Sequence, residues 1–228
     1  NLPREGIQKV FYHGPMFRHE RPQKGRYRQF HQVDVEVFGV YDAKIDAELI
    51  DITNSLWKLI GINNASLEIN SLGSSETRSS YRELLQNYFI ENKSQLDKDS
   101  LRRLTTHPLR ILDSKNSEME DLIESAPKMI DHIDDESEEH FSAFKNYLDC
   151  LEIPYSINPR LVRGLDYYNR TVFEWISNDL GAQGTICGGG RYDGLMEKMG
   201  GNPTPAIGFA IGIERLILLI KDQPNIIQ

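Results

Sequence analysis

The sequence predicts an α+β fold, with a mainly antiparallel sheet, flanking helices and a helical insertion. Segments that alternate apolar and polar residues occur near the start of the chain and again after residue 155. Residues at helical spacing gather in a central block, and an apolar helix follows the last predicted strand. Strands joined by hairpins, with helices segregated from them, are typical of antiparallel α+β domains. The 228 residues suffice for one large domain or two small ones.

The first predicted element is a hairpin. Residues 10–17 and 30–38 alternate in the way of half-buried strands, and Pro22 and Gly25 mark a turn between them. Apolar residues at helical spacing over residues 45–59 predict a helix that Gly61 ends. Residues 66–70 predict a short strand.

A block of helices follows. Ser75 can cap a helix whose apolar face includes Tyr81, Leu85 and Phe89. Shorter helical pieces follow at 101–104 and 119–123, and a longer helix begins near Asp135. We therefore divide the chain into a first part of a core domain, a helical insertion and a second part of the core. The predicted bounds are 1–73, 74–151 and 152–228.

Strand character returns in the last third of the chain. Residues 155–158, 170–177 and 184–187 predict strands, and three glycines at 188–190 interrupt the last pattern. Residues 192–199 predict a helix. Residues 206–212 predict a strand that runs directly into an apolar helix over 213–220.

The formal charge of −8 comes from one segment, residues 91–152, which has 16 acidic and 8 basic side chains. Such a balance disfavours a protein that coats nucleic acid generally. The sequence shows no signal-peptide pattern and no apolar run of membrane-spanning length. Cys150 and Cys187 fit no metal or disulfide pattern, so we expect a reducing, cytoplasmic compartment. Because the chain begins at Asn1, we expect it to be a piece of a longer protein.

The predicted turn of the first hairpin is rich in cations. They are Arg18, Arg21, Lys24, Arg26 and Arg28. Arginine binds phosphate oxygens in pairs and stays charged, so the turn is suited to a polyphosphate. A solvated basic turn is the simpler alternative. Gln32, Asp34 and Glu36 continue as a polar face along the second strand, which indicates a pocket beside the basic turn.

Two further segments suggest a ligand site. Arg215 lies in the first turn of the last helix, where the helix dipole disfavours a cation unless it faces a ligand; a surface arginine is the alternative. Tyr167 and Tyr168 should point to opposite faces of an extended chain, one into a cavity, although a core aromatic cluster is equally consistent. The glycines at 188–190 leave room for a flat ligand beside the backbone. The six histidines show no metal-ligand spacing.

These segments together resemble a known family. FRHERPQKGRYRQF and GFAIGIERL resemble motifs 2 and 3 of class II aminoacyl-tRNA synthetases. Between them, RGLDYYNRTVFEW and GGGRYDGL resemble the two signature segments of histidyl-tRNA synthetases of the bacterial type. The resemblance covers nearly the whole chain. It implies the class II catalytic fold, and formation of histidyl-adenylate from histidine and ATP before transfer to histidine tRNA.

The resemblance also implies roles for individual residues. Arg18 and Arg163 would be the catalytic cations at the α-phosphate. The expected ATP-binding residues are Arg18, Glu20, Arg26, Phe30 and Arg215, with Phe30 and Arg215 on the two faces of adenine. The expected histidine-binding residues are Gln32, Glu36, Arg163, Tyr167, Tyr168 and Tyr192. Mg²⁺ would bridge the outer phosphates, with no protein ligand assigned.

The resemblance leaves one alternative function. Synthetase-like paralogues serve as a regulatory subunit in histidine biosynthesis or as sensors of uncharged tRNA. We favour the enzyme, because Arg18, Arg26, Arg163 and Arg215 are all present and only catalysis requires them. The family's dimer-interface motif, a Glu-Gly-Thr segment and an anticodon-binding domain would lie outside this chain. The full-length protein is expected to be a homodimer, with no membrane association.

Overall fold

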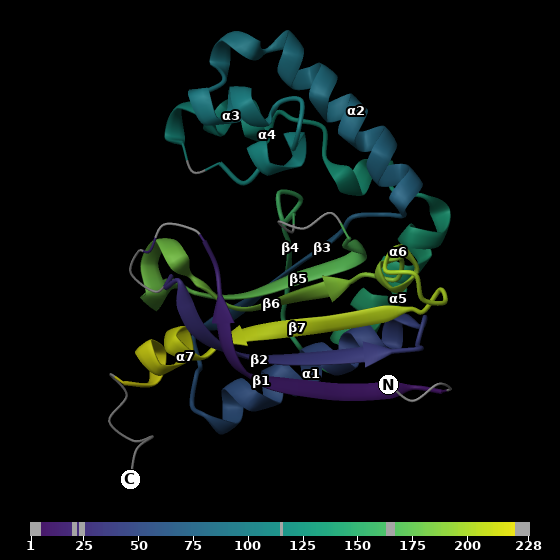
Figure 1. Cartoon of the computed structure of the whole chain (residues 1–228), viewed down its shortest axis with the longest axis vertical. Coiled ribbons are helices and arrows are strands. Elements are labelled where there is room, and N and C mark those ends of the chain that lie inside the picture. The colour runs from purple at the N-terminus through teal and green to yellow at the C-terminus, as the bar shows by residue number, and fades with distance from the viewer. Residues whose placement is uncertain (1–5, 20–21, 23–25, 115, 163–166, 222–228) are drawn as a thin grey trace.

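The computed structural model describes residues 6–19, 22, 26–114, 116–162 and 167–221. Within these residues a seven-stranded sheet has the order β1-β2-β7-β6-β5-β3-β4 (Figure 1). The strands are β1 (Gln8–Phe17), β2 (Gln29–Phe38), β3 (Ala65–Ser71), β4 (Ser156–Ile157), β5 (Asn169–Ser177), β6 (Thr185–Arg191) and β7 (Ala206–Gly212). Every neighbouring pair is antiparallel except β3 and β4. The predicted α+β class with a mainly antiparallel sheet is confirmed.

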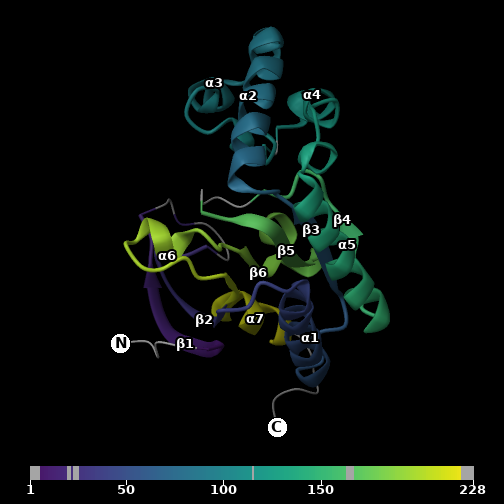
Figure 2. The same ribbon diagram turned by 90° about the vertical axis from the view of Figure 1, so that its right-hand side faces the viewer.

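Three helices cover one face of the sheet, which we call the apolar face (Figure 2). They are α1 (Ala43–Leu59), α5 (Asp135–Cys150) and α7 (Ile213–Ile220). Inward-facing side chains of the strands, such as Val37, Ile69, Phe173 and Phe209, pack against these helices in one hydrophobic core. Burial of this apolar surface fixes which side of each strand faces the helices.

A second hydrophobic core lies in the helices above the sheet in Figure 1. They are α2 (Ser75–Glu91), α3 (Lys98–Arg103) and α4 (Glu120–Glu124), joined by short 3₁₀ turns. Tyr81, Leu85, Phe89 and Ile111 form its centre. The side chain of Ser74 accepts a hydrogen bond from the Thr77 N–H and so caps α2, one residue before the predicted cap.

Helix α5 packs with the sheet core and not with these helices. Phe141, Phe144 and Leu148 are buried in the same cluster as α1 and the strands. We therefore propose that the insertion ends before α5, near residue 134, and not at residue 151. The sequence alone cannot distinguish the two, because an amphipathic helix shows that one face is buried and not which core buries it.

Two local predictions were wrong. Gly188, Gly189 and Gly190 do not interrupt a strand but continue β6, paired on both sides with β5 and β7. The predicted helix over 192–199 is reduced to α6 (Leu195–Lys198). Its beginning is displaced because Tyr192 and Asp193 hydrogen-bond to other segments before the helix starts. Among the described helices, none is long and apolar enough to cross a bilayer.

The second face of the sheet is polar and has small residues at its centre. Gln32, Asp34 and Glu36 of β2 lie opposite Gly212, Ala210 and Gly208 of β7. On β6, Gly188 lies opposite Ala210 and Gly190 lies opposite Gly208. Residues directly opposite in a ladder project to the same side, so these five small residues form the floor of a depression. We call the depression above these five residues (Gly188, Gly190, Gly208, Ala210, Gly212) the trough.

Candidate functional site

One end of the trough opens into a cavity of about 320 Å³. Five residues predicted for the site line it together: Arg18, Arg26, Phe30, Gln32 and Arg215. The motif-2-like hairpin supplies the first four, and α7 supplies Arg215. The structure therefore brings residues of the basic turn and of the first turn of the last helix together around one cavity.

The arginines in this cavity repel one another. Burial first, and then the charge of Arg26, lowers the pKa of Arg18 below its ordinary value. Burial, followed by the charges of Arg18 and Arg26, lowers the pKa of Arg215 in the same way. Guanidinium groups remain charged even after such shifts. The charges of Glu214 and Glu174 oppose these shifts, and a partly buried cluster of arginines favours the entry of an anion, so the cavity is suited to phosphate groups.

Direct contacts orient two of these arginines. The guanidinium carbon of Arg18 lies 3.7 Å from the centre of the Phe30 ring, and its Nε donates to the Tyr27 carbonyl at 2.8 Å. Arg215 donates from Nη1 to the Thr185 carbonyl at 2.5 Å. Arg18 therefore covers a face of Phe30, so adenine stacking on this ring is restricted to the other face.

Four further cavity residues were not singled out from the sequence: Tyr27, Glu174, Thr185 and Glu214. Glu214 accepts hydrogen bonds from the backbone N–H of His31 at 2.9 and 3.0 Å and contacts its Nδ1 at 3.0 Å. Thr185 donates to the Glu174 carboxylate at 2.8 Å. Glu214 and His31 lie 183 residues apart, so no local pattern signals their contact, whereas Thr185 and Glu174 lie 11 residues apart on neighbouring strands.

The other end of the trough contains a carboxylate and three tyrosines. The Tyr192 hydroxyl donates a hydrogen bond to Glu36. The rings of Tyr167 and Tyr168 lie 5.7 and 6.3 Å from that of Tyr192. The predicted histidine-binding residues Glu36, Tyr167, Tyr168 and Tyr192 are thus brought together, while Gln32 lines the arginine cavity.

The expectation that Tyr167 and Tyr168 point to opposite faces was wrong. Their ring centres lie 4.6 Å apart, with the planes inclined by 34°. This segment precedes β5 and is not part of a strand, so the alternation of a strand does not apply to it.

Burial controls the protonation of Glu36. Loss of solvent raises the pKa of its carboxyl group to about 7, the hydrogen bond from Tyr192 lowers it, and the charge of Asp34 raises it. Burial and the charge of Glu36 also raise the pKa of Tyr192, so its hydroxyl stays protonated as a donor. The pair offers an acceptor and a donor in a half-buried site, which is suitable for an imidazole ring.

Near this end of the trough, glycine is required at several positions because other protein atoms lie against the backbone. A Cβ atom on Gly208 would lie 1.6 Å from the Glu36 carboxylate. One on Gly190 would lie 3.0 Å from the Tyr168 ring, and one on Gly189 would meet the Gly208 carbonyl at 2.2 Å. Of the three consecutive glycines, Gly188 lines the arginine cavity, Gly188 and Gly190 lie on the floor of the trough, and Gly189 lies opposite Phe209, which packs in the core.

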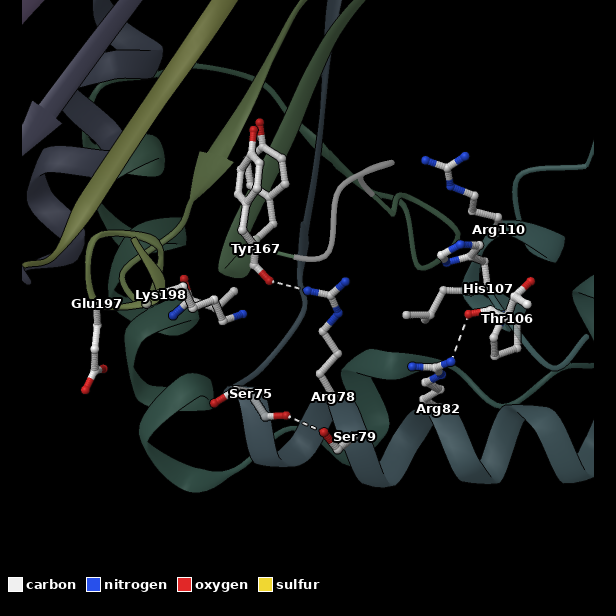
Figure 3. Close-up of a pocket in the computed structure, with 15 residues that line it drawn as sticks. Ser75, Arg78, Ser79, Arg82, Thr106, His107, Arg110, Tyr167, Glu197 and Lys198 are labelled. Atoms are coloured by element: carbon white, nitrogen blue, oxygen red, sulfur yellow. Dashed lines mark hydrogen bonds between the residues drawn. The ribbon is translucent and has the colours of Figure 1, made fainter. Parts of the chain in front are cut away.

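A second cavity, of about 430 Å³, lies between α2 and the tyrosines (Figure 3). Its charged lining consists of Arg78, Arg82, Arg110 and Lys198 against one carboxylate, Glu197. Arg78 donates to the Tyr168 carbonyl at 2.6 Å, and Arg82 donates to the Thr106 carbonyl at 2.8 Å. We call this cavity the basic groove. The groove is lined mainly by cations, although residues 106–110 of its lining belong to the acidic segment 91–152.

Glu20 and Arg163 lie outside the described residues. Within the described part, no group of three or more His, Cys, Asp or Glu side chains is arranged to hold a metal ion. Glu174 and Glu214 nevertheless provide oxygen atoms in the arginine cavity. One or two carboxylates together with substrate phosphates are a common Mg²⁺ environment.

The comparison with known proteins identifies relatives over almost the whole chain. A family model described as histidyl-tRNA synthetase matches residues 1–216. A histidine–tRNA ligase of Ruthia magnifica subsp. Calyptogena magnifica is 68% identical over 98% of this chain, and one of Hydrogenovibrio crunogenus is 62% identical over 97%. The chain spans about half the length of these curated relatives, 53% and 52%.

Solved structures show the same fold. The crystal structure of apo S. aureus histidyl-tRNA synthetase matches 94% of this chain and 51% of that one, with 38% identity and a TM-score of 0.73. A Bacillus halodurans structure described as an ATP phosphoribosyltransferase regulatory subunit/histidyl-tRNA synthetase matches 97% of this chain and 60% of that one. Its identity is 23% and its TM-score 0.63, so it shows the shared fold alone.

Proposed function

Because this chain belongs to the histidyl-tRNA synthetase family, we propose that it is the catalytic part of a histidine–tRNA ligase. The reaction joins histidine to ATP as histidyl-adenylate, releases pyrophosphate and then transfers the histidyl group to the 3′ end of histidine tRNA. The observation that carries this proposal is the trough with two different ends. One end gathers arginines, and the other pairs Glu36 with Tyr192.

The spacing of the two ends suits a two-substrate reaction. Gln32 and Glu36 lie four residues apart on one face of β2, which corresponds to about 13 Å. An α-amino acid bound at Glu36 would extend its carboxylate toward the arginines. Attack by a carboxylate oxygen on the α-phosphorus then forms the acyl-phosphate bond as the bond to pyrophosphate breaks. No covalent enzyme intermediate is needed, so catalysis consists of positioning and charge stabilisation.

Each residue has a defined role in this proposal. Arg18 binds the α-phosphate and the histidine carboxylate, and Arg163 contacts the α-phosphate from the other side. Arg26 and Arg215 bind the outer phosphates and adenine. The free face of Phe30 stacks on adenine, and Glu20 makes a further adenine contact. The roles of Arg163 and Glu20 rest on the sequence resemblance.

The histidine side chain binds at the tyrosine end. Glu36 accepts a hydrogen bond from one imidazole nitrogen, because a neutral imidazole always has one N–H to donate. Tyr167, Tyr168 and Tyr192 surround the ring, and Gln32 lies toward the substrate's polar end. Glu174 and Glu214 would be candidate protein ligands for Mg²⁺, which would supply positive charge for the outer phosphates.

The basic groove is the proposed path of the tRNA 3′ end. Its cations can neutralise backbone phosphates, and Tyr167 offers an aromatic surface for a base. The groove adjoins the tyrosine end of the trough, where the activated histidyl group would be transferred. We further propose a cytoplasmic location and a homodimer in the full-length protein. Exposed Phe11 and Phe17 on the edge strand β1 support the dimer.

A regulatory paralogue is the competing function. The fold is compatible with both, but a regulatory subunit has no need of clustered arginines at a nucleotide site. The test is histidine-dependent exchange of pyrophosphate into ATP by the full-length protein. Exchange that requires histidine supports the ligase, and histidine binding without exchange would support the regulatory function.

A further inference from the structure

We propose that Arg191 and Asp46 are positioning residues for the histidine pocket. They form a buried ion pair that fixes Glu36 and Tyr192 relative to each other. This inference rests on the proposed function, because it concerns how the same pocket is held in its binding geometry. Neither residue belongs to the predicted site, and both lie on the apolar side of the sheet.

The guanidinium of Arg191 is fully buried and fully hydrogen-bonded. Its Nη2 donates to Asp46 at 2.5 Å and to the Asp42 carbonyl at 3.4 Å, and its Nε donates to Asp46 at 3.4 Å. Its Nη1 donates to the Val40 carbonyl and to Asp193, each at 3.0 Å. An arginine has five N–H donors, so the printed bonds account for the whole fork.

These bonds join the two segments that carry the pocket pair. Val40 and Asp42 belong to the loop that follows β2, the strand of Glu36. Arg191 and Asp193 are the two neighbours of Tyr192. Asp193 is fixed further, since it accepts from the Ala206 N–H at 3.0 Å and its own N–H donates to Asn169 at 2.9 Å. The Arg191 side chain therefore links the loop after the strand of Glu36 directly to the segment of Tyr192, in addition to the pairing of both through β7.

Asp46 anchors this arrangement to the helices. It is fully buried on α1, and its carboxylate also contacts Nε2 of His140 on α5 at 2.8 Å. Burial alone would raise the pKa of Asp46, but its hydrogen bond with His140 and the charge and hydrogen bonds of Arg191 lower the pKa, so Asp46 remains a carboxylate. A buried ion pair adds little stability over well-packed apolar side chains, but it demands a particular geometry. A pocket that recognises its ligand by hydrogen bonds requires donors and acceptors at fixed positions, here Tyr192 and Glu36.

The test uses Arg191→Lys and Asp46→Asn in the full-length protein. Lysine retains the charge but cannot reproduce a planar five-donor fork, and asparagine retains the shape without the charge. In pyrophosphate exchange, we expect the KM for histidine to rise about tenfold and the KM for ATP to stay within about twofold, because only the histidine pocket loses its geometry. Arg160→Lys is the matched control, since Arg160 also pairs with two carboxylates, Glu120 and Glu124. It should leave both constants unchanged.

Thermal unfolding of each variant is recorded so that both constants are measured on folded protein. A histidine KM within about twofold of the wild-type value, or equal rises in both constants, would overturn the inference. Loss of thermal stability alone, or failure of both variants to fold, would show a purely structural pair and would also overturn it. An absence of histidine-dependent exchange in the wild-type protein would instead overturn the proposed function, and the inference with it.

Discussion

Arg18 lies over the ring of Phe30, with 3.7 Å between the guanidinium carbon and the ring centre. The aromatic face attracts the cation, which lines the same cavity as Arg26 and Arg215 despite the repulsion between like charges. Phe30 thus orients a proposed phosphate-binding group, and its other face is the one we propose for a base.

Phe30→Ala should weaken ATP binding by removing both contacts. A cation–π contact and a stacking surface together are worth roughly 1–2 kcal/mol, so the KM for ATP should rise roughly tenfold in pyrophosphate exchange. The KM for histidine should change little. Phe30→Trp retains an aromatic face and should restore most of the ATP affinity. An alanine variant with normal ATP affinity would show that Phe30 does not hold Arg18 in a functional position.

Glu36→Gln should weaken histidine binding and leave ATP binding nearly intact. Loss of the charged acceptor for an imidazole N–H should cost roughly 2–3 kcal/mol, or about a hundredfold in affinity by calorimetry. Glu68→Gln is a matched control, because Glu68 lies on the same face of the sheet and bonds to Asn158. If both variants bind histidine as the wild type does, Glu36 is only a strand-surface carboxylate.

Gly208→Ala should disturb the proposed histidine pocket, because Gly208 lies against the Glu36 carboxylate. The added Cβ would overlap the Glu36 carboxylate and lie 2.6 Å from the Val35 carbonyl, so the strand or the side chain must move. Overpacking of this kind costs roughly 1–3 kcal/mol, and histidine affinity should fall with it. At Gly194 a Cβ would meet nothing within 4 Å, so Gly194→Ala should bind histidine normally. Equal affinities in the two variants would contradict the close packing of Glu36 on Gly208.

The free energy of unfolding should fall as the pH rises, because burial raises the pKa of Glu36. Its carboxyl has a pKa of about 7 in the folded protein and an ordinary value of 4.5 when exposed. Between these values the unfolded chain releases the proton while the folded protein retains it, so unfolding becomes more favourable as pH rises. The effect is fully developed above pH 7. It is absent below pH 4.5, where both states are protonated.

Glu36→Gln removes this dependence because glutamine is neutral throughout. Relative to wild type, the variant should gain roughly 1–2 kcal/mol between about pH 5 and about pH 8, measured by denaturation without ligands. A wild-type protein whose stability relative to the variant rises over this range would show that Glu36 is ionised and favourably paired.

Much of the fold follows from sequence periodicity. The alternation in β2 identifies both its apolar side (Val33, Val35, Val37) and its polar side (Gln32, Asp34, Glu36). The apolar helix pattern gives the bounds of α7, residues 213–220, without error. These features depend only on which side of an element is buried, and a regular hydrophobic pattern records that.

What sequence reasoning missed depends on distant partners. Glu214 meets His31 across 183 residues, and Arg191 meets Asp46 across 145. Neither pair leaves a local signal. The paired tyrosines at 167 and 168 lie outside a regular strand, so the alternation rule failed for them. The glycines of β6 read as an interruption because the neighbouring residues they accommodate, Tyr168 and Gly208, come from other segments.

The central claim is that the two ends of one trough bind the two halves of histidyl-adenylate. The most direct test is calorimetric titration of the full-length protein with a non-hydrolysable histidyl-adenylate analogue that has a sulfamoyl link in place of the phosphate. Because one molecule would span both ends, it should bind at least about a hundredfold more tightly than histidine or ATP alone. Both Glu36→Gln and Arg215→Ala should weaken that binding. An analogue that binds no more tightly than histidine, or that is insensitive to one of these substitutions, would contradict the claim.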